Sequence, residues 1–258
     1  MVFNSIFFIF CFLPVFMLIY YLVPGKLRNL LLFLGSLIFY AWGEPVYVIL
    51  MLFSSIFNYY MGTELERLYY DDRKQKINLI FSIIINLAVL VFFKYYGFLL
   101  NTIGGIIGIH IPHPELSLPI GLSFYTFRNL SYLFDIYLSK VSAQRNFLTF
   151  SVYSTMFPYT SAGPIVRYTD IETQLKQRTI NISKFGIGAE LFVKGLAKKV
   201  LLADNLSVLY SSICGHPQMS VFTSWLGILA YTMQLYFDFS GYSDMAIGLG
   251  KMFGFHFL

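Results

Sequence analysis

The sequence predicts an all-α polytopic membrane protein. Only 12% of its 258 residues are charged and 57% are hydrophobic, with a mean hydropathy of +0.66. Soluble domains carry about 25% charged residues, so this chain lacks the polar side chains needed to cover a surface that faces water. Uncharged stretches long enough to cross a bilayer recur along the chain, separated by short charged segments.

The first predicted span covers residues 3–23, which contain no charged residue. A helix needs roughly 20 apolar residues to cross a bilayer, whereas a cleaved leader has a basic start and a shorter apolar segment. We therefore expect a retained transmembrane helix here. Residues 29–62 are also apolar but are interrupted by Gly-Glu-Pro at 43–45. Since proline disfavours helix in the residue before it, this segment predicts two short spans joined by a tight turn.

Two more spans are expected over residues 77–109 and 120–138. Lysine and arginine occur in the connection after the first span, in the loop at 64–76 and just after residue 138, whereas the loop at 110–119 has neither. Cytoplasmic loops of membrane proteins are enriched in these residues. The pattern predicts five spans up to residue 138, with the N-terminus outside.

The pattern changes in the second half of the chain. Residues 147–168 are too polar and too rich in proline and glycine for a simple span, and irregular backbone at membrane depth needs protein or water around it, so a re-entrant segment is expected. Residues 183–204 repeat apolar side chains at helical spacing, which predicts an amphipathic interfacial helix. Residues 219–237 predict a further span. No repeat or linker divides the chain, so residues 1–258 are expected to form one membrane domain.

Several classes of site are not expected. The net charge of +5 is explained by basic cytoplasmic loops rather than by a nucleic-acid partner. His110 and His113 have a spacing that could suit a metal, but no third ligand accompanies them, and no metal site is predicted. Cys11 and Cys214 form no CxxC motif, so neither a disulfide framework nor a structural zinc site is indicated.

Ionisable side chains within the predicted spans are candidates for a functional site, because charge is costly in a bilayer. Arg128 and Asp135 are seven residues apart and lie near one face of a helix, where they could line a polar cavity or pair with neighbouring helices. Asp238 and Asp244 are six residues apart, which separates them by about 120° around a helix. They therefore do not form a facing pair of carboxylates.

Ser240 and Asp244 are four residues apart and share a helix face. Ser240 is a good N-cap, and an acidic residue near a helix start suits the helix dipole. We therefore expect a span that ends near Phe237, a polar break at 238–241, and then a new helix. Such broken helices line substrate sites in transporters. The residues alone leave open a transporter or translocation channel with a polar intramembrane pathway, an intramembrane enzyme with a cavity for a polar acceptor, and a purely structural membrane subunit.

Four stretches resemble the membrane-bound O-acyltransferase family, in its bacterial branch that acetylates alginate and other polysaccharides. They occur in the family's order, and the resemblance extends from the first predicted span to Leu258. They are "LPIGLSFYTFRNLSYLFDIY" at 118–137, "AGPIVRY" at 162–168, "GLAKKVLLADNL" at 195–206 and "QLYFDFSGYSDMAIGLGKMFGF" at 234–255.

The resemblance implies transfer of an acyl group, with acetyl expected, to hydroxyls of an extracytoplasmic polysaccharide. It implies a donor used on the cytoplasmic side, such as acetyl-CoA or an acylated carrier, and no bound cofactor. The implied setting is the bacterial inner membrane, in a multi-pass protein that could work with a secreted acetyltransferase-like partner. The implied fold is a ring of short and tilted helices, with re-entrant and interfacial segments, around a thin centre crossed by a tunnel.

Candidate site residues follow from this resemblance together with the intramembrane charges. The basic stretch at 194–199 could rest on anionic headgroups, at about 1 kcal/mol per basic residue, or could form the entrance for a phosphate-bearing acyl donor. Its candidate residues are Lys194, Lys198 and Lys199. The candidates for cavity or tunnel walls are Asp238, Ser240, Tyr242, Asp244, Arg128, Asp135 and Arg167.

The chain also departs from the family pattern. Members of the family carry a presumed catalytic histidine in a Trp-His context, in a later membrane segment, and no such stretch occurs here. Arg128 stands where glutamine or histidine is expected, and "FPYTSAGP" replaces the usual "FPQL-AGP". The chain thus resembles the N-terminal part of a longer, truncated family domain. We expect the catalytic histidine to lie beyond Leu258 and the 258-residue chain to be inactive alone.

Overall fold

The computed structural model describes residues 2–109, 112, 117–160, 163–216 and 220–257. The regular elements within these ranges are all helices, as the sequence predicts. His110 and His113, the weak metal candidates, lie outside them. The helices group into two compact units. That they belong to a single membrane domain stays a prediction. The first unit comprises Met1–Arg28, Ala162–Val166 and Asp170–Leu258; the second comprises Asn29–Ser161 and Arg167–Thr169.

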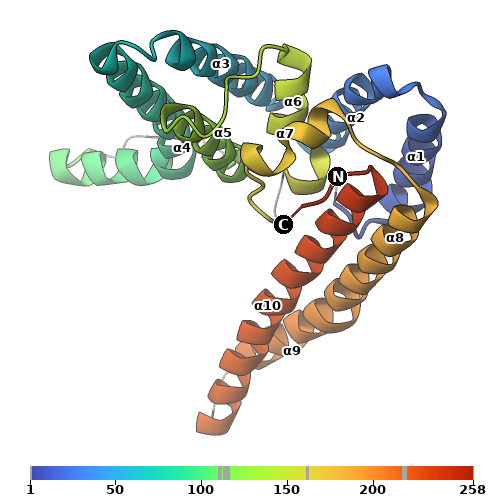
Figure 1. Ribbon diagram of the computed structural model, residues 1–258. Coiled ribbons are helices and arrows are strands. Elements are labelled where there is room, and N and C mark those ends of the chain that lie inside the picture. The colour runs from blue at the N-terminus through green and yellow to red at the C-terminus, as the bar shows by residue number, and fades with distance from the viewer. Residues whose placement is uncertain (1, 110–111, 113–116, 161–162, 217–219, 258) are drawn as a thin grey trace. The chain divides into compact units, whose positions relative to one another are not determined.

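The first unit is built around α10, the long helix coloured red in Figure 1. Helices α8 and α9 lie along α10 and are joined to each other by a π-helical turn, η4. Asparagine and serine side chains cap the starts of α8 and α10, which explains why each helix begins where it does. The elements are η1 (Phe8–Phe12), α1 (Leu13–Leu22), η2 (Gly25–Leu27), most of α7 (Tyr168–Lys176), α8 (Ile182–Ala197), η4 (Lys198–Ala203), α9 (Asp204–Cys214) and α10 (Val221–Met252).

Glycines let α8 and α10 approach until their backbones touch. A Cβ atom placed on Gly195 would lie 2.5 Å from the carbonyl oxygen of Gly241, and one placed on Gly188 would lie 2.6 Å from that of Gly248. Gly188 and Gly195 are seven residues apart on α8, and Gly241 and Gly248 are seven residues apart on α10. A spacing of seven is about two helical turns, so the two glycines of each helix lie on the same face. Small residues at such spacing are the usual means of close helix packing in membranes.

The second unit contains α2 (Arg28–Gly43), α3 (Val48–Arg67), α4 (Asp72–Ile107), α5 (Leu122–Tyr137), α6 (Phe147–Thr155) and the short turn η3 (Phe157–Tyr159). The interruption predicted at 43–45 is confirmed, because α2 ends at Gly43 and α3 begins at Val48. Helix α4 begins after Asp71, whose carboxylate accepts a hydrogen bond from the backbone amide of Lys74 at 3.0 Å. Hydrogen bonds from Lys74 hold the pKa of the Asp71 carboxyl below its usual range.

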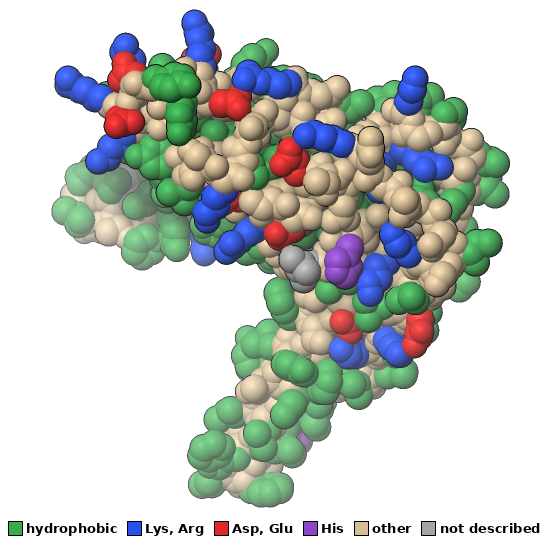
Figure 2. Space-filling model, viewed as in Figure 1, with side chains coloured by type: hydrophobic (Ala, Val, Ile, Leu, Met, Phe, Trp, Pro, Cys, Tyr) green, Lys and Arg blue, Asp and Glu red, His purple; other side chains and the backbone are tan. Residues whose placement is uncertain are grey.

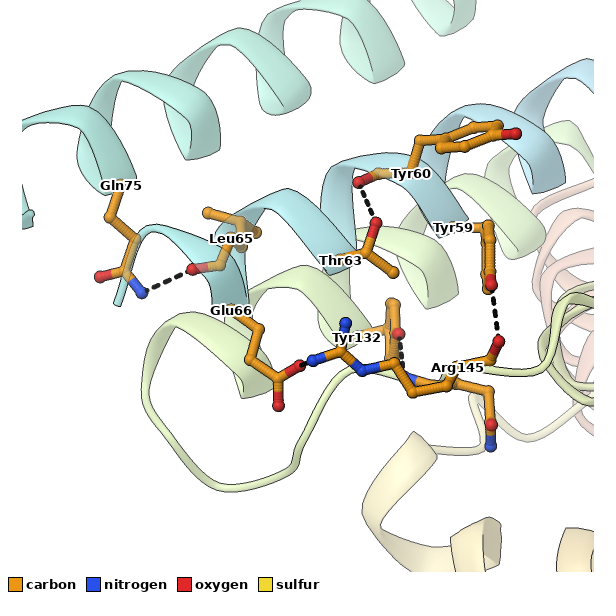
Figure 3. A network of polar contacts seen from close by, with 9 residues as sticks. Tyr59, Tyr60, Thr63, Leu65, Glu66, Gln75, Tyr132 and Arg145 are labelled. Carbon is orange, nitrogen blue, oxygen red and sulfur yellow. Dashed lines mark hydrogen bonds and ion pairs between the residues drawn. The ribbon is translucent and has the colours of Figure 1, made fainter. Parts of the chain in front are cut away.

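A set of polar contacts joins α3 to its neighbours at its charged end (Figure 3). The Tyr59 hydroxyl donates to the backbone carbonyl of Arg145 at 2.7 Å, and the Arg145 guanidinium forms an ion pair with Glu66. The Gln75 side chain donates to the Leu65 carbonyl at 3.1 Å, which bridges the turn from α3 to α4. The two contacts of Arg145 hold the connection before α6 against α3.

Two described helices are long and apolar enough to cross a membrane, namely α3 and α4. The 36 residues of α4 correspond to about 54 Å of helix, well beyond the thickness of a bilayer core. The apolar run Phe8–Leu22, α2 and α5 occupy three other predicted spans but are shorter than 18 residues. Large hydrophobic side chains are exposed on both units, and Figure 2 shows many of them over α9 and the first half of α10.

The second half of the chain differs from the prediction in two places. Helix α10 runs without a break from Val221 to Met252, so the interruption predicted at 238–241 and the role of Ser240 as an N-cap are wrong. The break was inferred from the capping preference of Ser240 and from the helix dipole, but the carboxylates of Asp238 and Asp244 instead have lysine partners on η4. The predicted amphipathic helix at 183–204 also continues further, through η4 and α9 to Cys214.

Candidate functional site

A cluster of opposite charges joins η4 to α10 in the first unit. The ammonium nitrogen of Lys198 lies 2.6 Å from Oδ2 of Asp244 and also donates to Oγ of Ser240 at 3.1 Å. The ammonium nitrogen of Lys199 lies 2.8 Å from Oδ1 of Asp238. We call Lys198, Lys199, Asp238 and Asp244 the lysine–aspartate cluster. It brings together the motifs at 195–206 and 234–255, which are separated in sequence.

The π-helical turn contributes to this geometry. Lys199 also lies 3.0 Å from Oδ1 of Asp204, the residue five positions later, and five residues is the spacing of the backbone hydrogen bonds in a π-helix. Short π-helical segments are frequent at functional sites. Asp204 was not among the residues singled out from the sequence, and its pairing with Lys199 follows no α-helical spacing that would have indicated it.

The cluster is only partly shielded from solvent. The side chain of Asp244 is 22% exposed and that of Asp238 is 45% exposed, so the Lys198–Asp244 pair is the better buried of the two. In such a partly buried ion pair, the lower local dielectric constant strengthens the attraction between the charges, and the loss of hydration of both charges opposes it. Charge neutralisation explains how α10 carries two carboxylates in an apolar stretch without breaking.

A groove of about 600 Å³ borders the better buried pair. Its walls are mainly aliphatic, with the Lys198–Asp244 ion pair at one side. Such a groove can hold an apolar chain while presenting a polar group to one end of it. The lining residues are Leu191, Lys194, Ala197, Lys198, Leu201, Leu202 and Asp244.

The three lysines proposed as a donor entrance all have carboxylate partners. Lys194 forms an exposed ion pair with Glu190 at 2.6 Å, one helical turn away on α8. Their mutual hydrogen bond raises the pKa of Lys194 and lowers that of Glu190. With Lys198 and Lys199 bound in the cluster, the basic stretch offers much less net positive charge than its sequence suggests. Its role as a donor entrance stays a prediction.

Tyr242 links this region to the motif at 162–168. Its ring stacks on Phe3 with 4.8 Å between centroids. Gly163, which has a positive φ of 100°, packs against the same ring, since a Cβ there would lie 3.3 Å from it. The structure thus places three of the sequence candidates, Ser240, Tyr242 and Asp244, on one stretch of α10 that contacts other motif residues.

Arg128 lies in the second unit and is fully buried on α5. Its guanidinium donates from Nη1 to the Ser154 carbonyl at 3.0 Å and from Nη2 to the Tyr159 carbonyl. The guanidinium carbon also sits 4.1 Å from the centre of the Tyr159 ring. Arg128 therefore binds backbone carbonyls in the last turn of α6 and at the end of η3, where helical hydrogen bonds end and carbonyl groups need other donors.

Buried amide and hydroxyl groups extend the network around Arg128. Asn58 and Asn86 exchange reciprocal amide hydrogen bonds of 3.0 and 2.9 Å between α3 and α4. The hydroxyl of Ser154 donates to Asn129 at 2.9 Å, and Asn129 donates to Ser54 at 3.1 Å. Sequence reasoning missed these groups because neutral polar residues in apolar segments carry no charge or motif signal.

The remaining sequence candidates are placed differently. Asp135 is buried near the end of α5, and its carboxylate lies 3.9 Å from the Lys140 ammonium. Arg167 is exposed and belongs to the second unit. The candidates are therefore not all brought together: those on α10 lie at or beside the charge cluster of the first unit, whereas Arg128, Asp135 and Arg167 belong to the second.

We expect the Lys198–Asp244 pair to contribute measurably to stability. In a double-mutant cycle of Lys198→Met and Asp244→Asn, the coupling free energy should be about 1–3 kcal/mol, because the pair is close and partly buried. The control cycle of Lys194→Met and Glu190→Gln removes an exposed ion pair within α8 and should give a clearly smaller coupling free energy. Unfolding of the purified protein in detergent measures both. Equal coupling in the two cycles would contradict the structural importance of the cluster.

Comparison with known proteins finds relatives over the whole length of the chain. The family model for MBOAT, the membrane-bound O-acyltransferase family, matches residues 42–258. The chain is 41% identical over its whole length to half of a "Probable alginate O-acetylase AlgI" from Pseudomonas aeruginosa. It is 33% identical over 98% of its length to 54% of a "Peptidoglycan O-acetyltransferase" from Helicobacter pylori.

A more distant match is a "Teichoic acid D-alanyltransferase" from Bacillus subtilis, which is 27% identical over 56% of the chain and 38% of the relative. The three relatives are named for the O-acetylation of alginate, the O-acetylation of peptidoglycan and the D-alanylation of teichoic acid. The chain spans about half the length of the curated relatives it matches most extensively.

Proposed function

Because the chain belongs to the membrane-bound O-acyltransferase family, we propose that its protein transfers an acyl group, expected to be acetyl, to hydroxyls of an extracytoplasmic polysaccharide. The observation that carries the proposal is the meeting of two family-like motifs, 195–206 and 234–255, at one ion-paired contact beside an apolar groove. The names of relatives that match the whole chain support acetyl as the group and a polysaccharide or peptidoglycan as the acceptor.

The proposed reaction sets requirements for the site. An acceptor hydroxyl attacks the carbonyl of an acyl thioester, forming a C–O bond and breaking the C–S bond. A general base takes the hydroxyl proton, which finally goes to the leaving thiolate, and hydrogen-bond donors stabilise the oxyanion. In this proposal the groove beside Lys198 and Asp244 forms part of the wall along which the acyl donor lies.

The base itself is proposed to come from the part of the protein that corresponds to the relatives' other half. Among the described residues, His216 and His256 are both exposed, and neither lines the groove. Lys198 and Asp244 are already paired with each other, so we assign them to shaping the groove rather than to proton transfer. Residues 1–258 are then one part of a longer membrane domain.

The setting of the reaction is also part of the proposal. The positive-inside pattern supports a multi-pass inner-membrane protein with its N-terminus outside. A cytoplasmic donor such as acetyl-CoA or an acylated carrier and an outer acceptor require passage of the acyl group across the membrane. A secreted acetyltransferase-like partner would receive or complete the transfer, and the bilayer is the other partner. No feature of the described residues favours the transporter or structural-subunit alternatives.

Deletion of the gene tests this proposal. We expect ester-linked acetate, released by mild alkali from the cell-envelope or secreted polysaccharide, to fall to background and to return with the full-length gene. Expression of residues 1–258 alone should not restore it, because the proposed base lies elsewhere. Unchanged acetate after deletion would contradict the function, whereas acetate restored by residues 1–258 would contradict only the placement of the base.

A further inference from the structure

A second cavity lies in the first unit, away from the lysine–aspartate cluster. It has a volume of about 380 Å³ and forms where the segment between α7 and α8 meets the end of α10. Gly254 allows this approach, because its φ of 87° suits glycine and a Cβ there would lie 3.1 Å from the Thr179 carbonyl oxygen. The lining residues are Gln174, Gln177, Arg178, Thr179, Lys184, Ile187, Lys251, Gly254, Phe255 and His256.

The charge of this cavity is of one sign. Arg178, Lys184 and Lys251 line it together with His256, and none of the described residues that line it is acidic. Converging cations around a cavity produce a positive potential that attracts an anion.

Arg178 is held in a defined orientation. Its Nε donates to the Tyr20 hydroxyl at 2.8 Å, and that hydroxyl donates to the Phe253 carbonyl at 2.8 Å. The guanidinium also lies 4.7 Å from the centre of the Phe255 ring. A guanidinium oriented by stacking and by its Nε is well prepared to recognise a phosphate group, which it can bind through two parallel hydrogen bonds.

The other basic groups are positioned by neighbouring side chains. The Gln174 amide accepts from the His256 backbone N–H at 2.6 Å and donates to the His256 carbonyl at 3.2 Å, which holds His256 beside α7. The Lys184 ammonium donates to the Thr179 hydroxyl at 2.9 Å. Lys184 lies in the first turn of α8, where a positive charge is unfavourable next to the helix dipole. A bound anion would remove that conflict.

The cavity is also near the basic connection that follows α1. The guanidinium of Arg28 lies 5.6 Å from the centre of the Tyr20 ring, the same residue that orients Arg178. Arg28 and Lys26 form the connection that the positive-inside pattern assigns to the cytoplasm. With that orientation, we place the cavity near the cytoplasmic side.

We propose that the cavity lined by Arg178, Lys184, Lys251 and His256 is a binding site for a phosphate-bearing anion. The ligand chemistry is a phosphate mono- or diester, which could belong to a soluble phosphate-bearing acyl donor or to a phospholipid headgroup. If the ligand is the soluble donor, the inference rests on the proposed function and places donor recognition at this cavity rather than at the stretch 194–199. If it is a lipid, the site is independent of the reaction.

Direct binding to the full-length protein in nanodiscs tests the site. Discs of phosphatidylcholine are titrated with coenzyme A as the soluble probe, and discs containing phosphatidylglycerol are analysed for lipid that remains bound after detergent exchange. In the double variant Arg178→Gln, Lys251→Gln, binding of one or both probes should weaken at least about tenfold, because charge-assisted contacts to phosphate are lost. The control Lys176→Gln removes an exposed lysine of α7 that pairs with Glu172, and should change binding less than about twofold.

Each outcome has a stated meaning. Loss of coenzyme A binding alone identifies the soluble source, and loss of phosphatidylglycerol alone identifies the lipid. If the first variant does not fold, the double variant Lys184→Gln, Lys251→Gln is tested in its place, because it keeps the packed Arg178. Probe binding that is equal in the wild-type, variant and control proteins, or is absent from the wild-type protein, would overturn the site. Because the readout is binding, a negative acetate assay would leave this result standing.

Discussion

Replacing Arg128 with methionine is expected to lower the free energy of unfolding by about 3–5 kcal/mol, since hydrogen bonds to a charged group each contribute about 1.5–3 kcal/mol. Arg128 is fully buried and donates to two backbone carbonyls, those of Ser154 and Tyr159. Methionine fills a similar volume but leaves these carbonyls without that donor in a region closed to water. Denaturation of the purified protein in detergent measures the loss, and we also expect a lower yield from the membrane.

Two further variants separate the possible causes. Arg145→Met removes an arginine of the same unit whose side chain is 71% exposed and paired with Glu66, and should cost only about 0–1 kcal/mol. Arg128→Lys keeps the charge but cannot reproduce the planar fork or the stacking on Tyr159, so it should remain clearly destabilised. A lysine variant as stable as the wild type would show that charge alone, rather than the two directed hydrogen bonds, is what the site requires.

Replacing Gly195 with alanine is expected to destabilise the first unit by about 2–3 kcal/mol, which is towards the upper end of typical overpacking costs. The added Cβ would lie 2.5 Å from the Gly241 carbonyl oxygen and 2.7 Å from the Met245 nitrogen. Both are backbone atoms, so no side-chain rotation relieves the clash and α8 must move away from α10. That movement would also weaken the ion pairs of the lysine–aspartate cluster, which bridge the same contact.

Gly186 provides a matched control on the same helix. It is exposed, and a Cβ placed there has no neighbour within 4 Å. Since alanine favours a helix over glycine by about 1 kcal/mol, Gly186→Ala should leave stability unchanged or raise it slightly. Thermal unfolding in detergent compares the two variants. If both substitutions had the same effect, the close α8–α10 contact would not be the source of the loss.

Local features of the sequence were sufficient to predict where the first helices of the second unit, α2 to α4, begin and end. Apolar length and the Gly-Glu-Pro interruption predicted α2 and α3 with a turn between them, and charged loops marked the ends of α3 and α4. These signals lie within each element, so they need no knowledge of its neighbours. The motifs at 118–137, 162–168, 195–206 and 234–255 likewise indicated the family that the comparison shows.

The candidate site was predicted less completely. Asp238 and Asp244 were singled out correctly as unusual, and their separation around the helix indicated that they do not act as a pair. The inferred helix break was wrong because the sequence does not show that Lys198 and Lys199 neutralise them from residues about forty positions earlier. For Arg128, the sequence left two roles open: lining a polar cavity, or pairing with groups on neighbouring helices. The structure shows that its guanidinium donates hydrogen bonds to backbone carbonyls.

By itself, the sequence determined the class of protein, the positions of most helices and the family. Hydropathy, helix caps and motifs are properties of short contiguous segments, so they do not depend on what those segments pack against. Only the tertiary structure decided which charges meet, that α10 stays continuous, and that Arg178, Lys184 and Lys251 surround one cavity while the more conspicuous lysines at 194–199 are paired. The physical reason is that the cost of a buried charge depends on its partners in space, and those partners come from distant parts of the chain.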